Sequence, residues 1–119
     1  MSLPIIIISK KNDSKGNKRW RLVVDFHKLN AQTMNDSYPS PNIADIFDQL
    51  GNSQYFSTFD LASGYHQVLL KPEDRYKTAF STPNGYWQFV KMPMGLASAP
   101  ATFQRMMETL LRGLQYAEM

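Results

Sequence analysis

Asp60 is the residue of this sequence whose type and position best suit catalysis. It ends residues 55–60 (YFSTFD), a run rich in aromatic and β-branched residues that is typical of a half-buried strand. Residues 61–64 (LASG) follow, and the small residues Ala62, Ser63 and Gly64 would let a ligand approach the backbone. A carboxylate at a strand end beside such a turn suits a metal and phosphate site. Alternatively, Asp60 caps the turn with its own side chain, and these residues alone leave both interpretations open.

The N-terminal part of the chain carries a second candidate feature, an excess of positive charge. Residues 1–30 contain seven Lys or Arg and two Asp, whereas residues 31–119 contain six Lys or Arg and eight Asp or Glu. A basic end on a nearly neutral body predicts a polyanionic partner, such as a nucleic acid or a nucleoside triphosphate. A solvated hairpin tip that Lys keeps soluble explains the same charges equally well.

Composition excludes several other classes of site. The chain has 119 residues, enough for one domain, and 43% of them are hydrophobic, as in a globular protein. It contains no Cys and only two His, so disulfides and thiolate zinc sites are excluded and any zinc site is disfavoured. The apolar run at residues 4–8 is too short to cross a membrane or to form a signal peptide. We therefore expect an intracellular protein without a membrane partner.

The elements that position these residues begin with a hairpin. Residues 5–9 and 20–26 are β-branched runs, and the polar residues 10–19 between them contain Gly, which together predict a β-hairpin with a basic tip. Because the chain opens directly inside a strand, we expect it to begin part-way through a larger protein. Residues 30–38 are polar and predict irregular structure.

A helix is expected next, beginning at Ser40 and Pro41, because Ser caps helices and Pro is tolerated in their first turn. Apolar residues then recur at helical spacing as far as Leu50, and Gly51 is expected to end the helix. We expect this helix to pack on a sheet that contains residues 55–60.

The second half of the chain predicts a turn, a second hairpin and a last helix. The turn lies at residues 71–75, and the hairpin pairs residues 77–82 with 86–92 through an Asn-Gly turn. The helix begins near residue 98 and ends at Gly113. Since no linker or internal repeat divides the sequence, we expect one compact α+β unit.

Four segments together resemble the reverse transcriptases of retroviruses and LTR retrotransposons. Residues 20–30 (WRLVVDFHKLN) resemble the fingers motif, and residues 59–67 (FDLASGYHQ) resemble the first catalytic motif. Residues 92–104 (MPMGLASAPATFQ) resemble the motif that leads into the helix below the primer and template. Residues 77–80 (KTAF) lie between them, as in the Ty3/gypsy branch. The order and spacing match from about residue 4 to residue 116.

The resemblance implies a partial right-hand polymerase fold of the α+β class, with an antiparallel palm sheet backed by helices and β-rich fingers hairpins. The fingers would comprise residues 1–34 and 68–98, and the palm residues 35–67 and 99–119. The family also has a second carboxylate pair in a Tyr-x-Asp-Asp hairpin, a thumb and an RNase H portion, which this sequence lacks. We therefore expect one truncated reverse transcriptase domain.

The resemblance also implies a reaction, the addition of deoxynucleotides to a primer 3′-hydroxyl on an RNA or DNA template, assisted by two Mg²⁺ ions. Asp60 would be the catalytic carboxylate, and it would bind metal together with the main-chain carbonyl of Leu61. The residues that would bind the deoxynucleoside triphosphate are Lys10, Lys11, Arg21, Ser63, Gly64, Tyr65, Met94 and Gly95. Tyr65 would lie beneath the sugar. Met94 stands where retroviral enzymes carry Gln, which leaves apolar packing in place of a polar contact.

With one of three expected carboxylates, the chain itself is predicted to bind Mg²⁺ weakly and to be inactive. Its truncated edges would favour self-association, and its parent would act inside the cell, in a cytoplasmic particle or the nucleus. An alternative is a non-catalytic nucleic-acid-binding or interaction domain domesticated from a retroelement, although the presence of Asp60 favours an enzyme origin. An unrelated RNA-binding domain would need aromatic residues on an exposed sheet face, whereas Tyr55, Phe56 and Phe59 alternate like ordinary core residues.

Overall fold

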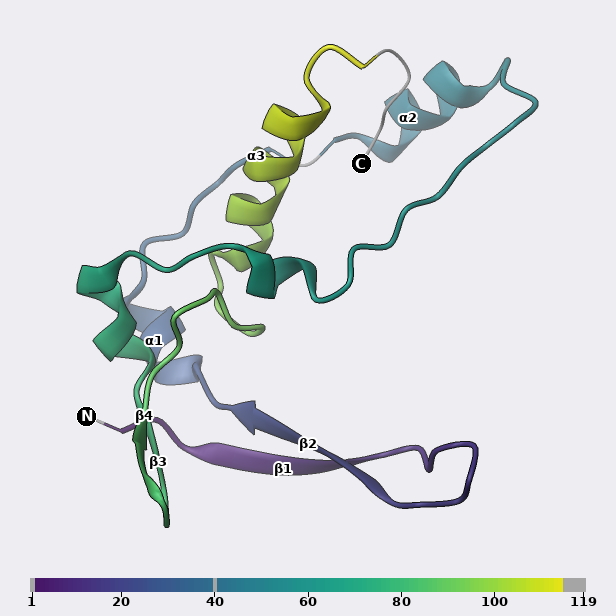
Figure 1. Ribbon diagram of the computed structural model, residues 1–119. Helices are drawn as coiled ribbons and strands as arrows, with labels where there is room; N and C mark the ends of the chain where they lie inside the picture. The colour runs from purple at the N-terminus through teal and green to yellow at the C-terminus, as the bar shows by residue number, and fades with distance from the viewer. Residues whose placement is uncertain (1, 40, 115–119) are drawn as a thin grey trace.

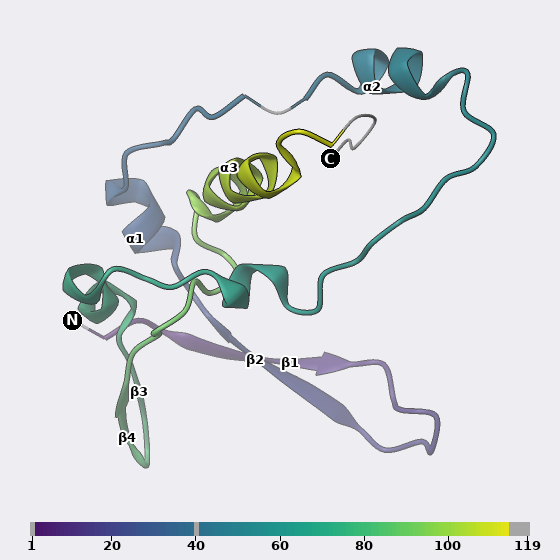
Figure 2. The same ribbon diagram turned by 45° about the horizontal axis from the view of Figure 1, so that its top comes forward.

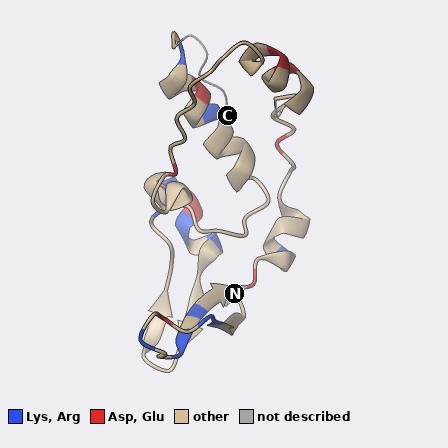
Figure 3. Ribbon diagram, turned by 90° about the vertical axis from the view of Figure 1, so that its right-hand side faces the viewer, with Lys and Arg blue, Asp and Glu red and all other residues tan. Residues whose placement is uncertain are grey.

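The first hairpin forms as the sequence predicts. The computed structural model describes residues 2–39 and 41–114, and in it β1 (Ile5–Lys10) pairs with β2 (Arg19–Val24) in antiparallel register, Ile5 opposite Val24 and Lys10 opposite Arg19 (Figure 1). The loop between the strands is tied by Asp13, whose carboxylate accepts hydrogen bonds from the backbone amides of Lys15 (2.9 Å) and Asn17 (2.8 Å). Lys and Arg gather on this hairpin (Figure 3).

The second hairpin is shorter than predicted. β3 (Phe80–Thr82) and β4 (Gly85–Trp87) are antiparallel strands, whereas the expected strands ran over residues 77–82 and 86–92. Residues 90–92 pair with residues 68–70 instead. The Met92 amide donates to the Val68 carbonyl at 2.8 Å, and the Leu70 amide donates to the Val90 carbonyl at 2.9 Å. The backbone groups of this segment are therefore satisfied by a bridge to residues 68–70 instead of a longer hairpin.

A small hydrophobic core joins the bases of the two hairpins. Leu3, Val24 and Phe26 are buried, and four partly buried residues pack around them: Leu29, Phe80, Phe89 and Leu96. The Phe26 and Phe89 ring centroids lie 6.1 Å apart, and the Leu3 amide donates to the Ala79 carbonyl at 2.9 Å. This core fixes the start of β1, the end of β2 and the entry to β3 relative to one another.

Three short helical segments replace stretches that the sequence predicts as strand, turn or loop. α1 (His27–Gln32) begins where the predicted strand should end, because the Asp25 carboxylate accepts a hydrogen bond from the His27 amide at 2.9 Å. That bond is the main cause of a lowered pKa for Asp25. Two 3₁₀-helices follow later in the chain, η1 (Gly64–Gln67) and η2 (Pro72–Thr78), the second of which includes the predicted turn.

The helix α2 (Ile43–Leu50) forms, but its expected packing is wrong. Its N-cap is Asn42, whose side chain accepts a hydrogen bond from the Ala44 amide at 3.1 Å, while the predicted cap Ser40 lies outside the described residues. The side chains of Ile43 and Phe47 are each 68% exposed. Both ribbon views show α2 standing apart from the two hairpins (Figures 1 and 2).

The strand predicted at residues 55–60 is also wrong, since this segment has no regular secondary structure. Tyr55 and Phe59 are 93% and 90% exposed, so the predicted core role of these aromatic residues is wrong as well. A strand needs a neighbour for its N–H and C=O groups, and within residues 2–39 and 41–114 none pairs with this segment. The described chain therefore lacks the expected palm sheet and the sheet face that an aromatic RNA-binding surface would require.

The molecule is elongated and not compact, contrary to expectation. Its extents are 56 × 42 × 21 Å and its radius of gyration is 18.1 Å. A compact domain of this length would have a radius of gyration of about 14 Å. The extra length comes from α2 and the extended segments on either side of it, which leave the hairpins and return (Figure 2).

The last helix confirms its prediction. α3 (Ala99–Leu111) has Ser98 as its N-cap and Pro100 in its first turn, and Gly113 follows it with φ of +92°. This left-handed conformation costs Gly little and ends the helix. α3 packs against η1, so it contacts the segment that begins just after Asp60.

Candidate functional site

The turn after Asp60 has a fixed backbone conformation. Ser63 has φ of 52° and ψ of 48°, and among the described residues it is the only one other than Gly with positive φ. Its carbonyl accepts a hydrogen bond from the His66 amide at 2.9 Å, and the Gln67 side chain donates to the Ala62 carbonyl at 2.9 Å. A left-handed non-Gly residue is strained, and such strain is concentrated at functional sites.

Gly64 and Tyr65 of this turn pack directly on Phe103 of α3. A Cβ atom on Gly64 would lie 2.9 Å from Cζ of Phe103, so a larger residue would force the ring to move. The Tyr65 and Phe103 rings meet edge to face, with centroids 5.3 Å apart and an interplanar angle of 82°. Edge-to-face geometry is a favoured aromatic arrangement and fixes the ring of Tyr65 against the helix.

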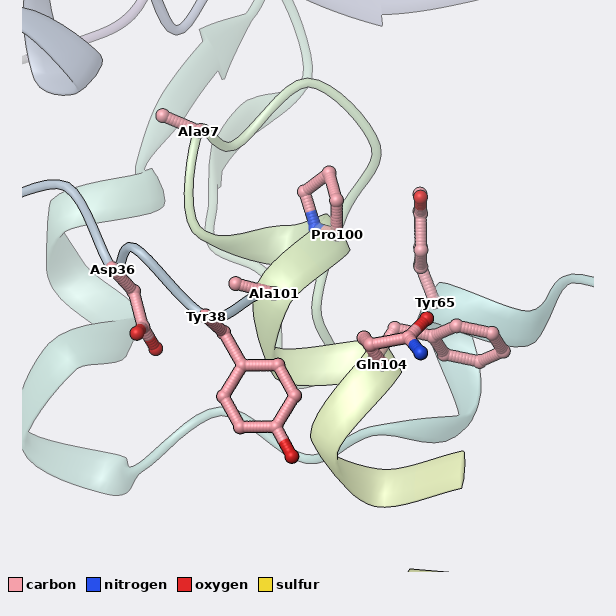
Figure 4. Close-up of a pocket in the computed structure, with 8 residues that line it drawn as sticks. Asp36, Tyr38, Tyr65, Ala97, Pro100, Ala101 and Gln104 are labelled. Atoms are coloured by element: carbon pink, nitrogen blue, oxygen red, sulfur yellow. The ribbon is translucent and has the colours of Figure 1, made fainter. Parts of the chain in front are cut away.

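Tyr65 and Phe103 form part of a hollow of about 320 Å³. Its other walls are Asp36, Tyr38, Ala97, Pro100, Ala101 and Gln104. Figure 4 shows Asp36 and Tyr38 on one side of this hollow and Tyr65 on the other, with the start of α3 between them. The hollow therefore lies where the segment before α2, the turn after Asp60 and α3 come together.

Side chains of α3 hold the Asp36–Tyr38 wall in place. Arg105 forms an ion pair with Asp36 at 2.5 Å, and its guanidinium lies 4.9 Å from the centroid of the Tyr38 ring. The Tyr38 hydroxyl donates a hydrogen bond to the Glu108 carboxylate. This bond raises the pKa of Tyr38 and is the largest cause of the lowered pKa of Glu108.

Asp60 itself is exposed, and among the described residues its carboxylate forms no hydrogen bond. The alternative that Asp60 caps the turn therefore finds no support in this structure. Its carboxylate and the neighbouring carbonyl of Leu61 are hard oxygen donors of the kind that Mg²⁺ prefers. Within residues 2–39 and 41–114, however, no three His, Cys, Asp or Glu side chains come close enough together to hold a metal ion. The donors present fit part of a Mg²⁺ site.

The basic residues predicted to bind a triphosphate lie in two different places. Arg21 points from β2 to the loop before α3, where its Nη2 lies 2.8 Å from Sδ of Met94. Lys10 ends β1 and lies opposite Arg19, and Lys11 follows it into the hairpin loop. The structure therefore brings Arg21 and Met94 together and leaves the two lysines further along the hairpin.

Residues 93–98, the loop before α3, are held from outside by Asn30 of α1. The Asn30 side-chain amide donates to the Gly95 carbonyl at 2.8 Å, and its side-chain oxygen accepts from the Ala97 amide at 2.8 Å. Gly95 has φ of +97°, a conformation that residues with a Cβ rarely adopt. The loop thus has one defined shape that carries Met94 and Gly95.

Comparison with known proteins places these features in a family. Residues 8–118 match the family model described as reverse transcriptase (RNA-dependent DNA polymerase). The chain belongs to this family. It is 48% identical over 111 residues to the retrovirus-related Pol polyprotein from transposon 297 of Drosophila melanogaster, covering 93% of this chain and 10% of that protein. It is 46% identical over 110 residues to the corresponding polyprotein from transposon gypsy, covering 92% of this chain and 11% of that protein.

A solved structure has a fold similar to that of this reverse transcriptase segment. The foamy viral protease-reverse transcriptase, whose structure is known in complex with an RNA/DNA hybrid, matches all of this chain and 15% of its own with a TM-score of 0.81. Sequence identity is 22%, so this match shows the fold alone. The chain spans about a tenth of the length of these two transposon polyproteins. The predicted resemblance to gypsy-type retrotransposon reverse transcriptases is therefore confirmed, and the chain is a fragment of such a domain.

Several residues around this candidate site could not be predicted from the sequence. Asn30 carries no local signal, since it stands at the end of a motif and inside a stretch that predicts irregular structure. Phe103 lies inside the motif at residues 92–104, but nothing in the sequence indicates its contact with Gly64 and Tyr65. The pairing of Arg105 with Asp36 joins residues 69 positions apart, which no short-range pattern could reveal.

Proposed function

We propose that this chain is the fingers and palm fragment of a retroelement reverse transcriptase whose full-length parent adds deoxynucleotides to a primer 3′-hydroxyl on an RNA or DNA template. The observation that carries the proposal is the close packing of Gly64 on Phe103. A Cβ atom on Gly64 would lie only 2.9 Å from Cζ of Phe103. This packing brings the two motifs at residues 59–67 and 92–104 into contact. The fingers would comprise residues 1–34 and 68–98, and the palm residues 35–67 and 99–119.

Asp60 is assigned the catalytic carboxylate in this proposal. Together with the carbonyl of Leu61 it would bind Mg²⁺, and the remaining carboxylates would come from a part of the parent outside this chain. When bound, two such ions stabilise the attacking and leaving oxygens of phosphoryl transfer. Because Asp60 is exposed, its carboxylate oxygens are accessible to a metal ion.

The incoming triphosphate would lie between the turn and the hairpin. The amides of Ser63 and Gly64 face it in this proposal, because a left-handed residue followed by a 3₁₀ turn exposes successive N–H groups that favour an anion. Arg21 supplies a charged, planar group that binds phosphate and stacks on a base. Lys10 and Lys11 add positive charge from the hairpin.

The nucleoside part would be bounded by Tyr65, Met94 and Gly95. Tyr65 would lie beneath the sugar, and its ring is held by Phe103. Met94 would pack against the nucleotide, with its sulfur next to Arg21. The absence of a side chain on Gly95 would let the nucleotide approach the loop backbone.

The proposed function also implies which molecules the parent enzyme binds. A template with its primer would bind the parent enzyme, as the RNA/DNA hybrid binds the foamy viral enzyme. The substrates would be deoxynucleoside triphosphates. The 119-residue chain by itself is proposed to be inactive, because Asp60 would be the one catalytic carboxylate that it contributes.

Primer extension tests the proposal. The assay compares the isolated chain with a full-length polymerase, meaning a polyprotein of the length of the relatives in which this chain occupies the matching positions. Asp60→Asn in the full-length polymerase should reduce incorporation by about 10³-fold or more, because an amide cannot replace a charged metal ligand. Template–primer affinity should stay nearly the same, and Asp45→Asn on exposed α2 is the matched control.

Three results would contradict parts of the proposal. Substantial residual incorporation by Asp60→Asn would remove Asp60 from catalysis. Incorporation by the isolated chain above a no-enzyme control would show that the catalytic carboxylates have been assigned wrongly. A full-length protein that binds nucleic acid but never extends a primer would favour the domesticated, non-catalytic alternative.

A further inference from the structure

We propose that Asn30 is a positioning residue for nucleotide binding, because it fixes the loop that presents Met94 and Gly95. The inference rests on the proposed function, in which these two residues border the incoming nucleotide. Asn30 would not touch the substrate. It would act through the two 2.8 Å hydrogen bonds that its side chain forms with the backbone of Gly95 and Ala97.

The loop needs such a contact from outside. The backbone bridge to residues 68–70 ends at Met92, and α3 begins at Ala99. Between them the chain makes a sharp turn in which Gly95 has φ of +97°. The Gly95 carbonyl and the Ala97 amide point to α1, and a carboxamide offers both the donor and the acceptor that this pair requires.

Asn30 is itself rigidly held, so it can define where the loop lies. Its backbone amide donates to the Phe26 carbonyl at 2.8 Å, and its carbonyl accepts from the Thr33 amide at 3.2 Å. Phe26 is buried in the core that joins the two hairpins, and one of its ring carbons lies 3.4 Å from the position of a Cβ on Gly95. The loop is thus located relative to the same core that anchors β2.

Arg21 links this arrangement to the triphosphate. It lies on β2, three residues before the core residue Val24, and its guanidinium contacts the Met94 sulfur at 2.8 Å. The core therefore fixes the position of Arg21 through β2, and it fixes the position of the loop with Met94 through Asn30. Losing the Asn30 contacts would let Met94 and Gly95 move relative to Arg21, and nucleotide binding depends on that geometry.

The test measures steady-state nucleotide incorporation by the full-length polymerase carrying Asn30→Ala or Asn30→Asp. Asn30→Ala removes both hydrogen bonds and should raise KM for the deoxynucleotide by about tenfold. Asn30→Asp retains an acceptor for Ala97 but places a carboxylate oxygen against the Gly95 carbonyl, so its KM should rise at least as much. Template–primer Kd should change by less than about twofold, since the loop is assigned to the nucleotide.

The matched control is Asn35→Ala, an exposed Asn in the segment that follows α1. It should leave KM unchanged. Melting curves for all variants separate positioning from folding, because a purely structural Asn30 would lower Tm while leaving KM unchanged at an assay temperature well below Tm. That result, or wild-type KM in both Asn30 variants, would overturn the proposal.

Met94→Ala separates this proposal from the one on which it rests. If Met94→Ala raises KM while both Asn30 variants do not, the loop binds nucleotide but Asn30 does not position it, and the inference fails alone. If none of the three variants changes KM, the loop does not border the nucleotide, and the assignment of Met94 and Gly95 fails with it. A rise in KM for Met94→Ala and for both Asn30 variants supports both.

Discussion

At the scale of single residues, the structure shows which side chains of residues 59–67 are constrained and which are exposed. Tyr65 and Gly64 are fixed against Phe103, whereas Asp60 is exposed. This difference is compatible with the proposed roles, in which Tyr65 shapes the substrate site and Asp60 binds metal. Tyr65 therefore offers the sharpest test of a role in choosing the substrate.

Tyr65→Val in the full-length polymerase should retain deoxynucleotide incorporation and admit ribonucleotides about tenfold better, equivalent to about 1.4 kcal/mol of lost discrimination. In the proposed arrangement the ring of Tyr65 lies beneath the sugar and would leave no room for a 2′-hydroxyl, because packed surroundings yield little. Incorporation ratios for the two sugars measure the effect. Tyr86→Val, at a tyrosine that is 86% exposed on β4, is the control. An unchanged ratio together with a lower Tm would make Tyr65 a packing residue only.

At the scale of elements, the β1–β2 hairpin divides into a part near the loop before α3 and a part far along the strands. Arg21 belongs to the first part through its contact with Met94. Lys10 and Lys11 belong to the second, at the end of β1 and in the loop. The two sets of charges should therefore differ in what they bind.

Arg21→Ala should raise KM for the deoxynucleotide more than the double change Lys10→Ala with Lys11→Ala, because Arg21 is the one of these three residues that contacts Met94 in the loop proposed to border the nucleotide. Steady-state kinetics and template–primer binding at several salt concentrations measure both effects. Lys15→Ala and Lys18→Ala, in the loop of the same hairpin, are the controls and should each change binding by less than about 0.5 kcal/mol. Equal losses of nucleotide and template affinity in all four variants, with a matching salt dependence, would point to a general phosphate track instead.

At the scale of the whole molecule, the chain has apolar surface that its own fold leaves uncovered. Ile43 and Phe47 on α2 are each 68% exposed, and Tyr55 and Phe59 are more exposed still. Large exposed apolar patches favour association. No helix among residues 2–39 and 41–114 is long and apolar enough to cross a membrane.

The isolated chain should therefore self-associate at concentrations on the order of 100 μM, as exposed apolar surface does in partly folded species. Sedimentation velocity over a range of concentrations measures this. The double change Ile43→Ser with Phe47→Ser should shift the chain towards monomer, while Met34→Ser, at a residue 92% exposed outside α2, should have little effect. A monomer at every concentration, or no difference between the two variants, would contradict the prediction.

The sequence alone determined the family and those elements whose contacts are local. These elements are the β1–β2 hairpin, the β3–β4 hairpin and α3. They depend on β-branched runs, turn residues, caps and helical spacing, which are all signals between residues close together in the sequence. The candidate residues Asp60, Ser63, Gly64, Tyr65, Met94 and Gly95 came instead from the resemblance to reverse transcriptases, and only Asp60 also stands out by its residue type and position. Their roles remain predictions.

Tertiary structure decided what those local patterns could not. Alternation at residues 55–60 is compatible with a strand, but a strand forms only when another segment supplies hydrogen bonds, and the described chain has none there. The contacts of Asn30 with Gly95 and of Arg105 with Asp36 join residues 65 and 69 positions apart, and their partners depend on how the chain packs. Local sequence specifies which hydrogen bonds a residue can make, and only the fold determines which groups come within 3 Å of it.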